Sequence, residues 1–560
     1  MDIRKITDDI SVSPQITAAD LPAIAKAGFR AIICNRPDGE GADQPGFAEI
    51  REAATKQGLQ AAYVPVQSGM VTDADVDAFA EALKDLPRPV LGYCRTGTRS
   101  ATLWSLNQAR ARRPLPEILA ATRAAGYDMA GVARRIANGG KTPTDAADAS
   151  FDVVIVGAGA GGIATAASLR RRKPELSIAV IDPADVHYYQ PGWTLVGGGV
   201  FAPEQTARTM GSLIPQGVKW IKAAVAAFEP QNDAVILDGC RVVKYGRLVV
   251  CPGLKLDWGA VAGLEETLGR NGVTSNYRYD LAPYTWQLVQ EMTRGRAIFT
   301  QPPMPIKCAG APQKAMYLSA DAWLRRGVLK DIEIHFMNAG GVLFGVKDYV
   351  PALMEYVEKY RASLDFFHNL VAVDGPARKA TFRVAKPDTA PEEVTVEFDM
   401  MHVCPPQTAP DFIRVSPLAD AAGWVDVDQA TLRHKHFNNI WSLGDVMNAP
   451  NAKTAAAARK QAPTVAENIA ADIDGRGPAA QYDGYGSCPL TVERGKIVLA
   501  EFGYGGVLKP SFPRFLIDGT RPSRLSWLLK ERILPPVYWR AMLKGREWLA
   551  RPEPLKVAAE

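Results

Sequence analysis

The chain has 560 residues, of which 47% are hydrophobic and 22% are charged, and its net charge is +5. This length predicts three or four domains of roughly 100–200 residues each, and so small a net charge argues against a nucleic-acid partner. Seven cysteines are too few for a disulfide scaffold, so we expect a reducing environment in which a cysteine pair that forms a disulfide is catalytic.

The first region, residues 1–137, alternates strand-like runs with amphipathic helical ones. The strand-like runs cover 30–34, 61–65 and 90–93, and helical patterns cover 18–27 and 73–84. This alternation predicts an α/β domain.

A cysteine loop follows the last of these strands. The sequence VLGYCRTGTRS runs from a strand into Cys94, reaches Arg99 and continues as a helix. Such a loop directs successive amide hydrogens at a thiolate, which lowers the pKa of the thiol and creates an anion site. Arg99 is predicted to close this site with a bidentate guanidinium.

This region resembles a small family with a tyrosine-phosphatase-like fold, through SVSPQI at 11–16 and AIICNRP at 31–37. Phosphatases of that fold use Cys-x5-Arg, usually after a histidine, but here the spacing is Cys-x4-Arg and Tyr93 precedes. CRTGTR is similar to the loop of rhodaneses, so we favour a sulfurtransferase. A phosphatase is the alternative. Because no histidine precedes His187, Asp43 would then be the candidate acid.

A polar stretch, 138–150, separates this region from a second α/β unit that we place at 151–515. The apolar strand FDVVIV is followed by Gly157, Gly159 and Gly162 and then by a helical pattern. Glycines let the backbone approach a pyrophosphate at the helix N-terminus. A second strand ends in Asp182, where a carboxylate accepts hydrogen bonds from an adenosine ribose.

Two later segments favour FAD over NAD at this site. YGRLVVCPG, which ends in Gly253, is similar to the strand-turn of flavin disulfide-reductase-like proteins. NIWSLGD resembles their last flavin motif, in which Gly444 and Asp445 face the ribityl chain. The resemblance implies FAD as the cofactor and two Rossmann-like domains as the fold.

The second nucleotide site of the NAD(P)H-dependent relatives is absent. The expected strand, 296–300, is followed by QPPMPIKCAGAPQK, which lacks a glycine fingerprint and contains Cys308. We therefore expect an electron donor other than a nicotinamide, and a cysteine near the flavin suggests sulfur. Lys307 is adjacent, but neighbours in an extended strand point apart, so it carries little weight.

At this point the chain resembles sulfide:quinone oxidoreductases, specifically the mitochondrial-type branch with two redox cysteines. The matching segments are PIKCAGAPQKAMYLS, HYYQPGWTLVGGG, FGVKDY, GWVDVD, GDVMNAPNAKTAAA and YDGYGSCPL. The resemblance implies that Cys308 and Cys488 are the redox pair. It also implies cofactor contacts from Lys453 and Thr454 and a quinone site near Phe344, Val346, Pro405 and Pro406.

The chemistry implied by this resemblance is thiol–disulfide exchange. Hydrosulfide attacks the Cys488 sulfur of a bridged pair and leaves a persulfide there, while Cys308 departs as a thiolate. Electrons pass through FAD to a ubiquinone-type quinone. Cys94 would accept the sulfane sulfur, and the final acceptor (sulfite, cyanide, glutathione or coenzyme A) stays open. The alternative is a quinone reductase of the same fold, driven by NADH or by another donor.

The last region, 516–560, is basic and rich in aromatic residues, and Pro535 and Pro536 are expected to divide it into two short helices. Such a segment suits a membrane interface. No run of about 18 apolar residues occurs and the N-terminus lacks a secretory signal. We expect a peripheral protein on the cytoplasmic face of a bacterial inner membrane. No metal is predicted because the histidines lack ligand spacing, and a homo-oligomer is left open.

Overall fold

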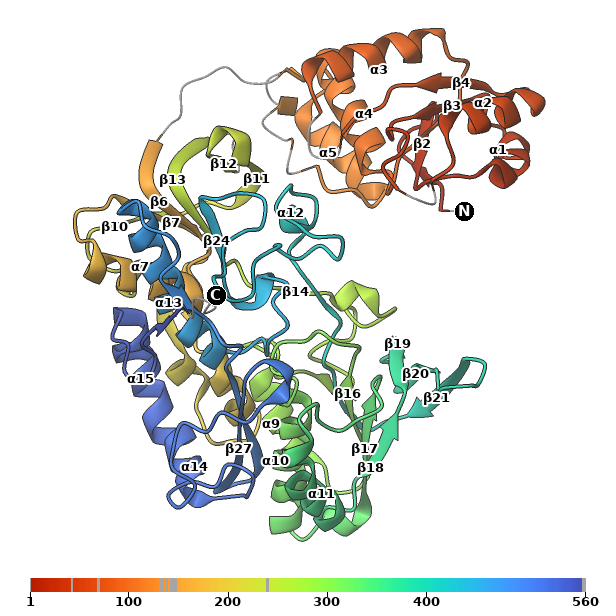
Figure 1. Ribbon diagram of the computed structural model, residues 1–560. Helices are drawn as coiled ribbons and strands as arrows, with labels where there is room; N and C mark the ends of the chain where they lie inside the picture. The colour runs from red at the N-terminus through yellow and green to blue at the C-terminus, as the bar shows by residue number, and fades with distance from the viewer. Residues whose placement is uncertain are drawn as a thin grey trace. The chain divides into compact units, whose positions relative to one another are not determined.

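The computed structural model describes residues 2–41, 44–67, 71–129, 132, 135, 136, 139–141, 149–237 and 241–555. Most of the predicted linker, 138–150, and the candidate acid Asp43 lie outside these residues. The chain forms two compact units (Figure 1). The first comprises 1–150, 223–245 and 411–419, and the second comprises the remaining residues. The predicted domain boundaries at 137, 150 and 515 stay predictions.

The first unit contains a five-stranded sheet in the order β1-β2-β5-β3-β4. All neighbours are parallel except β1 with β2. The strands are β1 Arg4–Lys5, β2 Ile10–Ser13, β3 Ala31–Cys34, β4 Gln60–Tyr63 and β5 Val90–Tyr93. The predicted runs at 30–34, 61–65 and 90–93 correspond to β3, β4 and β5.

Helices cover both faces of this sheet. α1 Leu21–Lys26 and α2 Phe47–Lys56 pack on one face with the side chains of Ile32, Cys34, Leu91 and Tyr93. α3 Asp73–Asp85, α4 Thr98–Arg110 and α5 Leu115–Ala124 pack on the other. The central strands β3 and β5 are apolar along their whole length because both faces are buried. The antiparallel strands β11 Val225–Glu229 and β12 Ala234–Leu237 also belong to the first unit.

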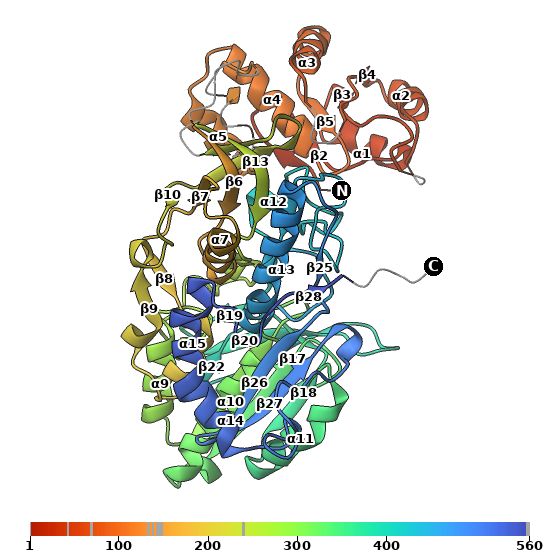
Figure 2. The ribbon, with the colours of Figure 1, turned by 60° about the vertical axis from the view of Figure 1, so that its left-hand side comes forward.

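The second unit begins with a parallel sheet in the order β10-β7-β6-β13, with β24 also paired with β13. Its strands are β6 Ala149–Val156, β7 Ile178–Ile181, β10 Val218–Ile221, β13 Val242–Val250 and β24 Ile440–Ser442. The helices α7 Ala160–Arg172 and α13 Ala455–Ile473 pack against each other beside this sheet (Figure 2). This is the strand–turn–helix arrangement that the glycine fingerprint predicts.

A second parallel sheet, β15-β22-β16-β17-β18, lies in the same unit. Its strands are β15 Val273–Thr274, β16 Gly295–Gln301, β17 Ile332–Asn338, β18 Ser363–Phe366 and β22 Met400–His402. The helices α9 Ala282–Glu291, α10 Ala311–Arg325 and α11 Val350–Lys359 enclose a core against it. The antiparallel strands β19 His368–Asp374, β20 Lys379–Val384 and β21 Glu392–Glu397 contribute to another core.

The chain then forms a hairpin and a helical segment. β26 Gly486–Glu493 pairs with β27 Lys496–Phe502, and β26 packs on α10. α14 Arg524–Leu528 continues through a π-helical turn, Leu529–Ile533, into α15 Leu534–Arg540. Pro535 and Pro536 lie in the first turn of α15, where a missing amide hydrogen costs little. The segment is therefore not interrupted at these prolines. Its helical pitch changes instead at the π-helical turn just before them.

Candidate functional site

The glycine fingerprint forms the turn between β6 and α7. Gly157 has a φ of +102°, and a Cβ there would lie 2.5 Å from the carbonyl oxygen of Cys251. A Cβ on Gly162 would lie 1.8 Å from the carbonyl oxygen of Gly157. No atom lies within 4 Å of the place where Gly159 would carry a Cβ. Gly159 therefore presents bare backbone to a cavity, which fits the close approach of a pyrophosphate.

This cavity brings together residues from distant parts of the second unit. Asp182, at the end of β7, lines it, and its Oδ2 accepts a hydrogen bond of 2.7 Å from the Ala158 amide. The other predicted cofactor contacts in the cavity wall are Gly253, Gly444, Asp445, Lys453 and Thr454. Gly157 and Gly162 shape the turn without lining the cavity.

The N-terminus of α13, which follows the last flavin motif, lies in the wall of the same cavity. Thr454 caps α13, because its Oγ1 accepts a hydrogen bond of 3.2 Å from the Ala457 amide. Ala455 and Ala456 line the cavity at this N-terminus, where the helix dipole is positive. Lys453 donates hydrogen bonds to the carbonyl oxygens of Asp445 and Met447, and burial raises the pKa of the Asp445 carboxyl. The amides at the N-terminus of α13 and the Lys453 ammonium are hydrogen-bond donors that fit the polar chain and ring edge of FAD.

Two cysteines from distant parts of the sequence lie close together at this cavity, and Cys308 is part of its wall. The Sγ atoms of Cys308 and Cys488 lie 3.3 Å apart although the residues are 180 positions apart in the chain. Cys308 precedes α10 with a φ of +50°, and its amide donates to the carbonyl oxygen of Lys453. Cys488 lies on β26 and is almost completely buried. The structure thus brings the two predicted redox residues within reach of a covalent bond.

The thiol environment differs between the two members of the pair. The hydrogen bond from Cys488 and then the charge of Lys314 hold the pKa of Cys308 well below its usual range. Lys314 Nζ lies 3.1 Å from Cys308 Sγ and 3.7 Å from Cys488 Sγ. The hydrogen bond with Cys308 and burial raise the pKa of the Cys488 thiol. Cys308 is therefore the thiolate and the better leaving group.

Sequence reasoning missed two lysines at this site. Lys314 lies on the first turns of α10, and its position six residues after Cys308 was a usable signal. Lys530, from the π-helical turn, is 4% exposed, and burial followed by the charge of Lys314 lowers its pKa to about 7. No local pattern connects Lys530 with the cysteines. Lys307 instead donates to Gln190 Oε1 at 2.7 Å.

The structure does not place the predicted quinone residues in the cavity wall. Phe344 packs edge-on against Tyr349 and Phe502 in a buried cluster that also contains Val346. Pro405 and Pro406 follow β22, and none of the four lines the cavity within the described residues. Apolar residues that do line the cavity include Pro489, Leu499, Phe512, Leu529, Leu534 and Val537.

The cysteine loop of the first unit joins β5 to α4. The Gly97 amide donates a hydrogen bond of 3.1 Å to Cys94 Sγ, and Gly97 has a φ of +86°. Cys94 is fully buried. Arg99 uses two of its donors elsewhere, because Nη1 bonds the Val66 carbonyl oxygen and Nη2 bonds Glu40 Oε2, each at 2.7 Å. The loop directs an amide at the thiol, while Arg99 is fixed against Glu40.

Comparisons with known proteins agree with this site. Residues 151–284 match the family model of pyridine nucleotide-disulphide oxidoreductases. The X-ray structure of the sulfide:quinone oxidoreductase from the hyperthermophilic bacterium Aquifex aeolicus aligns with a TM-score of 0.57 at 19% identity, covering 70% of this chain and 91% of that chain. The fold and the cavity define an FAD-binding flavoprotein of the flavin disulfide-reductase type.

A curated relative identifies the family. The mitochondrial sulfide:quinone oxidoreductase of Dictyostelium discoideum is 40% identical over 402 residues, which are 71% of this chain and 87% of that protein. The chain belongs to the sulfide:quinone oxidoreductase family.

The first unit matches a different group. Residues 2–111 match the phosphatase-like domain of the beta-lactamase hydrolase-like proteins. A beta-lactamase hydrolase-like protein of Agrobacterium fabrum is 35% identical over 105 residues, which are 19% of this chain and 24% of that protein. A phosphatase-like domain is therefore present at the N-terminus, as the sequence predicts.

Proposed function

We propose that this protein oxidises sulfide at the Cys308–Cys488 pair and passes the electrons through FAD to a quinone. The observation that carries the proposal is the separation of 3.3 Å between the two sulfurs, beside Lys314 and next to a cavity whose walls fit FAD. Its relatives in the family are named for sulfide and quinone, which supports the same substrates here. Bound in this cavity, FAD would supply a two-electron acceptor for the thiols.

The residues of the pair have distinct tasks in this scheme. Hydrosulfide attacks the sulfur of Cys488 in the bridged pair, so a new S–S bond forms there and the bond to Cys308 breaks. Cys308 leaves as a thiolate, which the Lys314 ammonium stabilises by charge. An acceptor nucleophile removes the sulfane sulfur from Cys488. Re-forming the bridge from the two thiols then releases two electrons and two protons.

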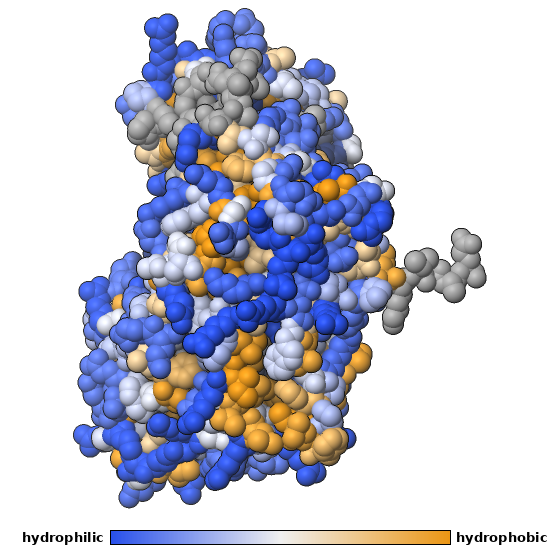
Figure 3. Space-filling view, turned by 90° about the vertical axis from the view of Figure 1, so that its left-hand side faces the viewer, coloured by the Kyte–Doolittle hydropathy of each residue, from blue (hydrophilic) through white to orange (hydrophobic). Residues whose placement is uncertain are grey.

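An exposed apolar surface suits contact with the membrane in which quinones dissolve. It consists of Phe515, Leu516, Leu525, Leu528 and Ile533, which we call the docking surface, and Phe515 is 92% exposed. Exposed arginines lie beside it at 514, 521, 524 and 532. Figure 3 shows apolar side chains gathered on the side of the molecule where α14 and α15 lie in Figure 1.

We assign this docking surface to the interface of a lipid bilayer. Within residues 2–555, as far as the structure describes them, no helix has the length and hydropathy needed to cross a membrane. Apolar side chains flanked by cations bind in the plane of an interface. Leu529 and Leu534, which line the cavity, belong to the same helical segment as the docking surface, so a quinone has a short route from lipid to the cavity.

For the first unit we propose sulfur transfer through Cys94. The amide of Gly97 donates a hydrogen bond to the Cys94 sulfur, and the Cys-x4-Arg spacing is the rhodanese one. Hydrolysis of a phosphate ester is the second candidate, favoured by the match of residues 2–111 to a phosphatase-like domain. Thiosulfate-to-cyanide transfer by the wild-type protein supports the first candidate, and hydrolysis of p-nitrophenyl phosphate without such transfer supports the second.

An anaerobic titration tests the main proposal. Sulfide is expected to bleach the flavin spectrum of the wild-type protein, and a short-chain ubiquinone is expected to restore it. Cys308→Ser and Cys488→Ser should each lower sulfide-dependent turnover at least about 100-fold while FAD stays bound, because nucleophilic exchange requires both sulfurs. Mass spectrometry should find the added sulfur on Cys488.

The control is a cysteine outside the pair. Cys404→Ser keeps a small polar side chain at a buried position that does not line the cavity, and turnover should change less than about threefold. Bleaching by NADH and not by sulfide would favour the quinone reductase alternative. Full turnover in either pair variant would refute the roles of the cysteines.

A further inference from the structure

A buried carboxylate lies in the cavity and takes no part in the sulfur chemistry. Glu501 is 5% exposed and lines the cavity from β27. Its Cα partner across the hairpin is Ser487, and Leu499 and Pro489 form the next pair but one on the same face. All four residues line the cavity. A carboxylate therefore lies at the edge of the apolar wall to which Leu529 and Leu534 also belong, where the route proposed for the quinone enters the cavity.

Glu501 accepts hydrogen bonds from two hydroxyl groups. Its Oε1 accepts from Tyr485 Oη at 2.6 Å and from Ser511 Oγ at 2.5 Å. Its Oε2 accepts from the Ser511 amide at 3.0 Å. The hydroxyls of Tyr485 and Ser511 are 3.1 Å apart. These three side chains form one connected set of groups, each able to give up a proton and take another.

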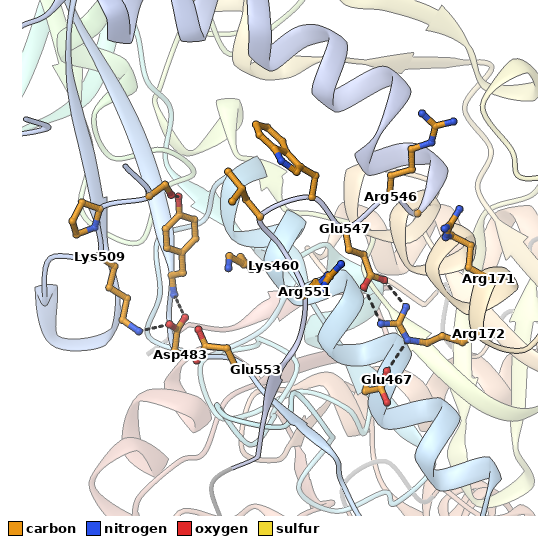
Figure 4. A pocket seen from close by; sticks show the side chains of 16 residues that line it. Arg171, Arg172, Lys460, Glu467, Asp483, Lys509, Arg546, Glu547, Arg551 and Glu553 are labelled. Atoms are coloured by element: carbon orange, nitrogen blue, oxygen red, sulfur yellow. Dashed lines mark hydrogen bonds and ion pairs between the residues drawn. The ribbon is translucent and has the colours of Figure 1, made fainter. Parts of the chain in front are cut away.

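The set connects the cavity with an open polar groove. Tyr485 and Ser511 line both spaces, whereas Glu501 lines only the cavity. Figure 4 shows the charged side chains of the groove, among them Lys460 and the ion pair of Lys509 with Asp483. Ser511 is exposed. Water in the groove can therefore reach a hydroxyl that contacts the buried carboxylate.

The hairpin places this set and Cys488 on opposite faces, although Cys308 lines the same cavity as Glu501. Side chains alternate between the two faces of a strand, so Ser487 and Glu501 share one face while Cys488 and its partner Ala500 share the other. Cys488 and Ala500 belong to the buried cluster against which Cys308 packs. The carboxylate thus lies beside Leu499 and Pro489 of the apolar wall, on the face of the hairpin opposite Cys488.

We propose that Glu501 delivers protons from the groove to the bound quinone through Tyr485 and Ser511. This inference rests on the proposed quinone reduction. Conversion of a quinone to a quinol adds two electrons, which the reduced flavin supplies, and two protons, which come from water. For each proton delivered, the O–H bond of protonated Glu501 breaks as an O–H bond forms on a quinone oxygen. The carboxylate then regains a proton from the Ser511 hydroxyl, which is replenished by water in the groove.

Several charged and titratable groups face this set. Arg459 and Lys460, on α13, lie near Tyr485, and Lys460 is 5.5 Å from the centre of its ring. Lys509 is paired with Asp483, and the hydroxyl of Tyr349 bonds the backbone of Glu501. Burial and then the Glu501 carboxylate raise the pKa of Tyr485, so its hydroxyl stays protonated at physiological pH.

The test separates the two half-reactions of the FAD-loaded protein in stopped-flow measurements. In Glu501→Gln, reoxidation of the reduced flavin by a short-chain ubiquinone should slow about 100-fold, the usual order of a lost proton donor. Bleaching by sulfide should stay within about twofold. The solvent deuterium effect on reoxidation should rise. Glu501→Asp, which keeps a proton-carrying group, should recover at least about tenfold of the loss.

The matched control is Glu553→Gln, which removes the same charge from a carboxylate that lines only the groove, and it should leave both half-reactions unchanged. Ubiquinone affinity, measured by equilibrium binding to the oxidised protein, should be unchanged in Glu501→Gln. Reoxidation within twofold of wild type, equal slowing of both half-reactions, or weaker quinone binding would overturn the relay. Because dithionite can replace sulfide as the reductant, failure of the sulfide reaction is distinguishable from failure of the relay.

Discussion

At the scale of single residues, the direction of one side chain decides which lysine serves the cysteines. Lys307 is next to Cys308 in sequence, but its ammonium bonds Gln190. Lys314 reaches Cys308 from the following helix at 3.1 Å. Burial alone would lower the pKa of Lys314, but the charges of Cys308 and Cys488 outweigh it and raise that pKa. Lys314 thus stays charged. The pKa that falls is that of the second buried lysine, Lys530.

A stability measurement checks the state of Lys530. Its native pKa of about 7 is below the ordinary value of 10.5, so between these two pH values the unfolded chain binds more protons. The contribution of Lys530 to the free energy of unfolding is therefore most unfavourable below pH 7 and improves as pH rises toward 10.5. Lys530→Met should stabilise the protein by about 1–4 kcal/mol at pH 6, and by much less near pH 10.

Urea unfolding of the oxidised, FAD-loaded variant and wild type at both pH values measures this difference. Lys330→Met, at an exposed lysine, controls for loss of a positive charge and should change stability by less than about 0.5 kcal/mol. If Lys530→Met is only as stable as wild type at pH 6, the conclusion that burial lowers the pKa of Lys530 is wrong.

At the scale of elements, the π-helical turn between α14 and α15 gives one segment two roles. Its residues Leu529 and Lys530 point into the protein and line the cavity, while Leu525, Leu528 and Ile533 are exposed. Widening of the helix at this turn changes which residues share a face, and π-helical turns are frequent at functional sites. The segment that we assign to the membrane therefore also completes the redox cavity.

The docking surface makes a prediction about lipid binding. The double change Leu525→Ser and Leu528→Ser removes two exposed apolar side chains, each worth roughly 1.5 kcal/mol or more on burial. Co-sedimentation with vesicles of mixed neutral and anionic lipid should weaken about 100-fold, while sulfide still bleaches the flavin. Leu324→Ser, at an exposed leucine of α10 outside the docking surface, should bind vesicles as wild type does. Equal binding by the double variant would exclude this surface as the contact.

At the scale of the whole molecule, one chain contains two compact units, and we propose a separate cysteine reaction for each. Cys94 lies in the first unit, whereas Cys308 and Cys488 lie in the second. Each unit has its own buried core. The two activities should therefore be separable by single substitutions.

Paired assays on one set of variants check this separation. Cys94→Ser should abolish thiosulfate-to-cyanide transfer and leave sulfide-dependent reduction of a short-chain ubiquinone within about twofold. Cys308→Ser should show the reverse pattern, because Cys308 is the leaving thiolate of the sulfide reaction and takes no part in sulfur transfer at Cys94. Cys34→Ser, at a buried thiol one strand away that bonds the carbonyl oxygen of Arg36, controls for a change in the first unit. Loss of both activities in Cys94→Ser would show that the units depend on each other.

Sequence patterns alone predicted the turns and strands that depend on only a few neighbouring residues. Gly157 and Gly162 occupy positions where a side chain would collide with backbone, so the fingerprint between β6 and α7 could be recognised without coordinates. Strands buried on both faces are apolar throughout, which placed β3 and β5 to within a residue. Resemblance of several motifs implied the flavin, and the family comparison confirms it.

Only the tertiary structure decided which side chains share the site. The contacts of Cys308 with Cys488, of Lys314 with both, and of Glu501 with Tyr485 and Ser511 depend on how α10, the β26–β27 hairpin and the last helical segment pack. Phe344 and Val346 match a family motif, yet packing puts them in a closed core. Sequence determines what each short segment becomes because backbone sterics act over a few residues, whereas proximity across 180 positions follows from the packing of the whole unit.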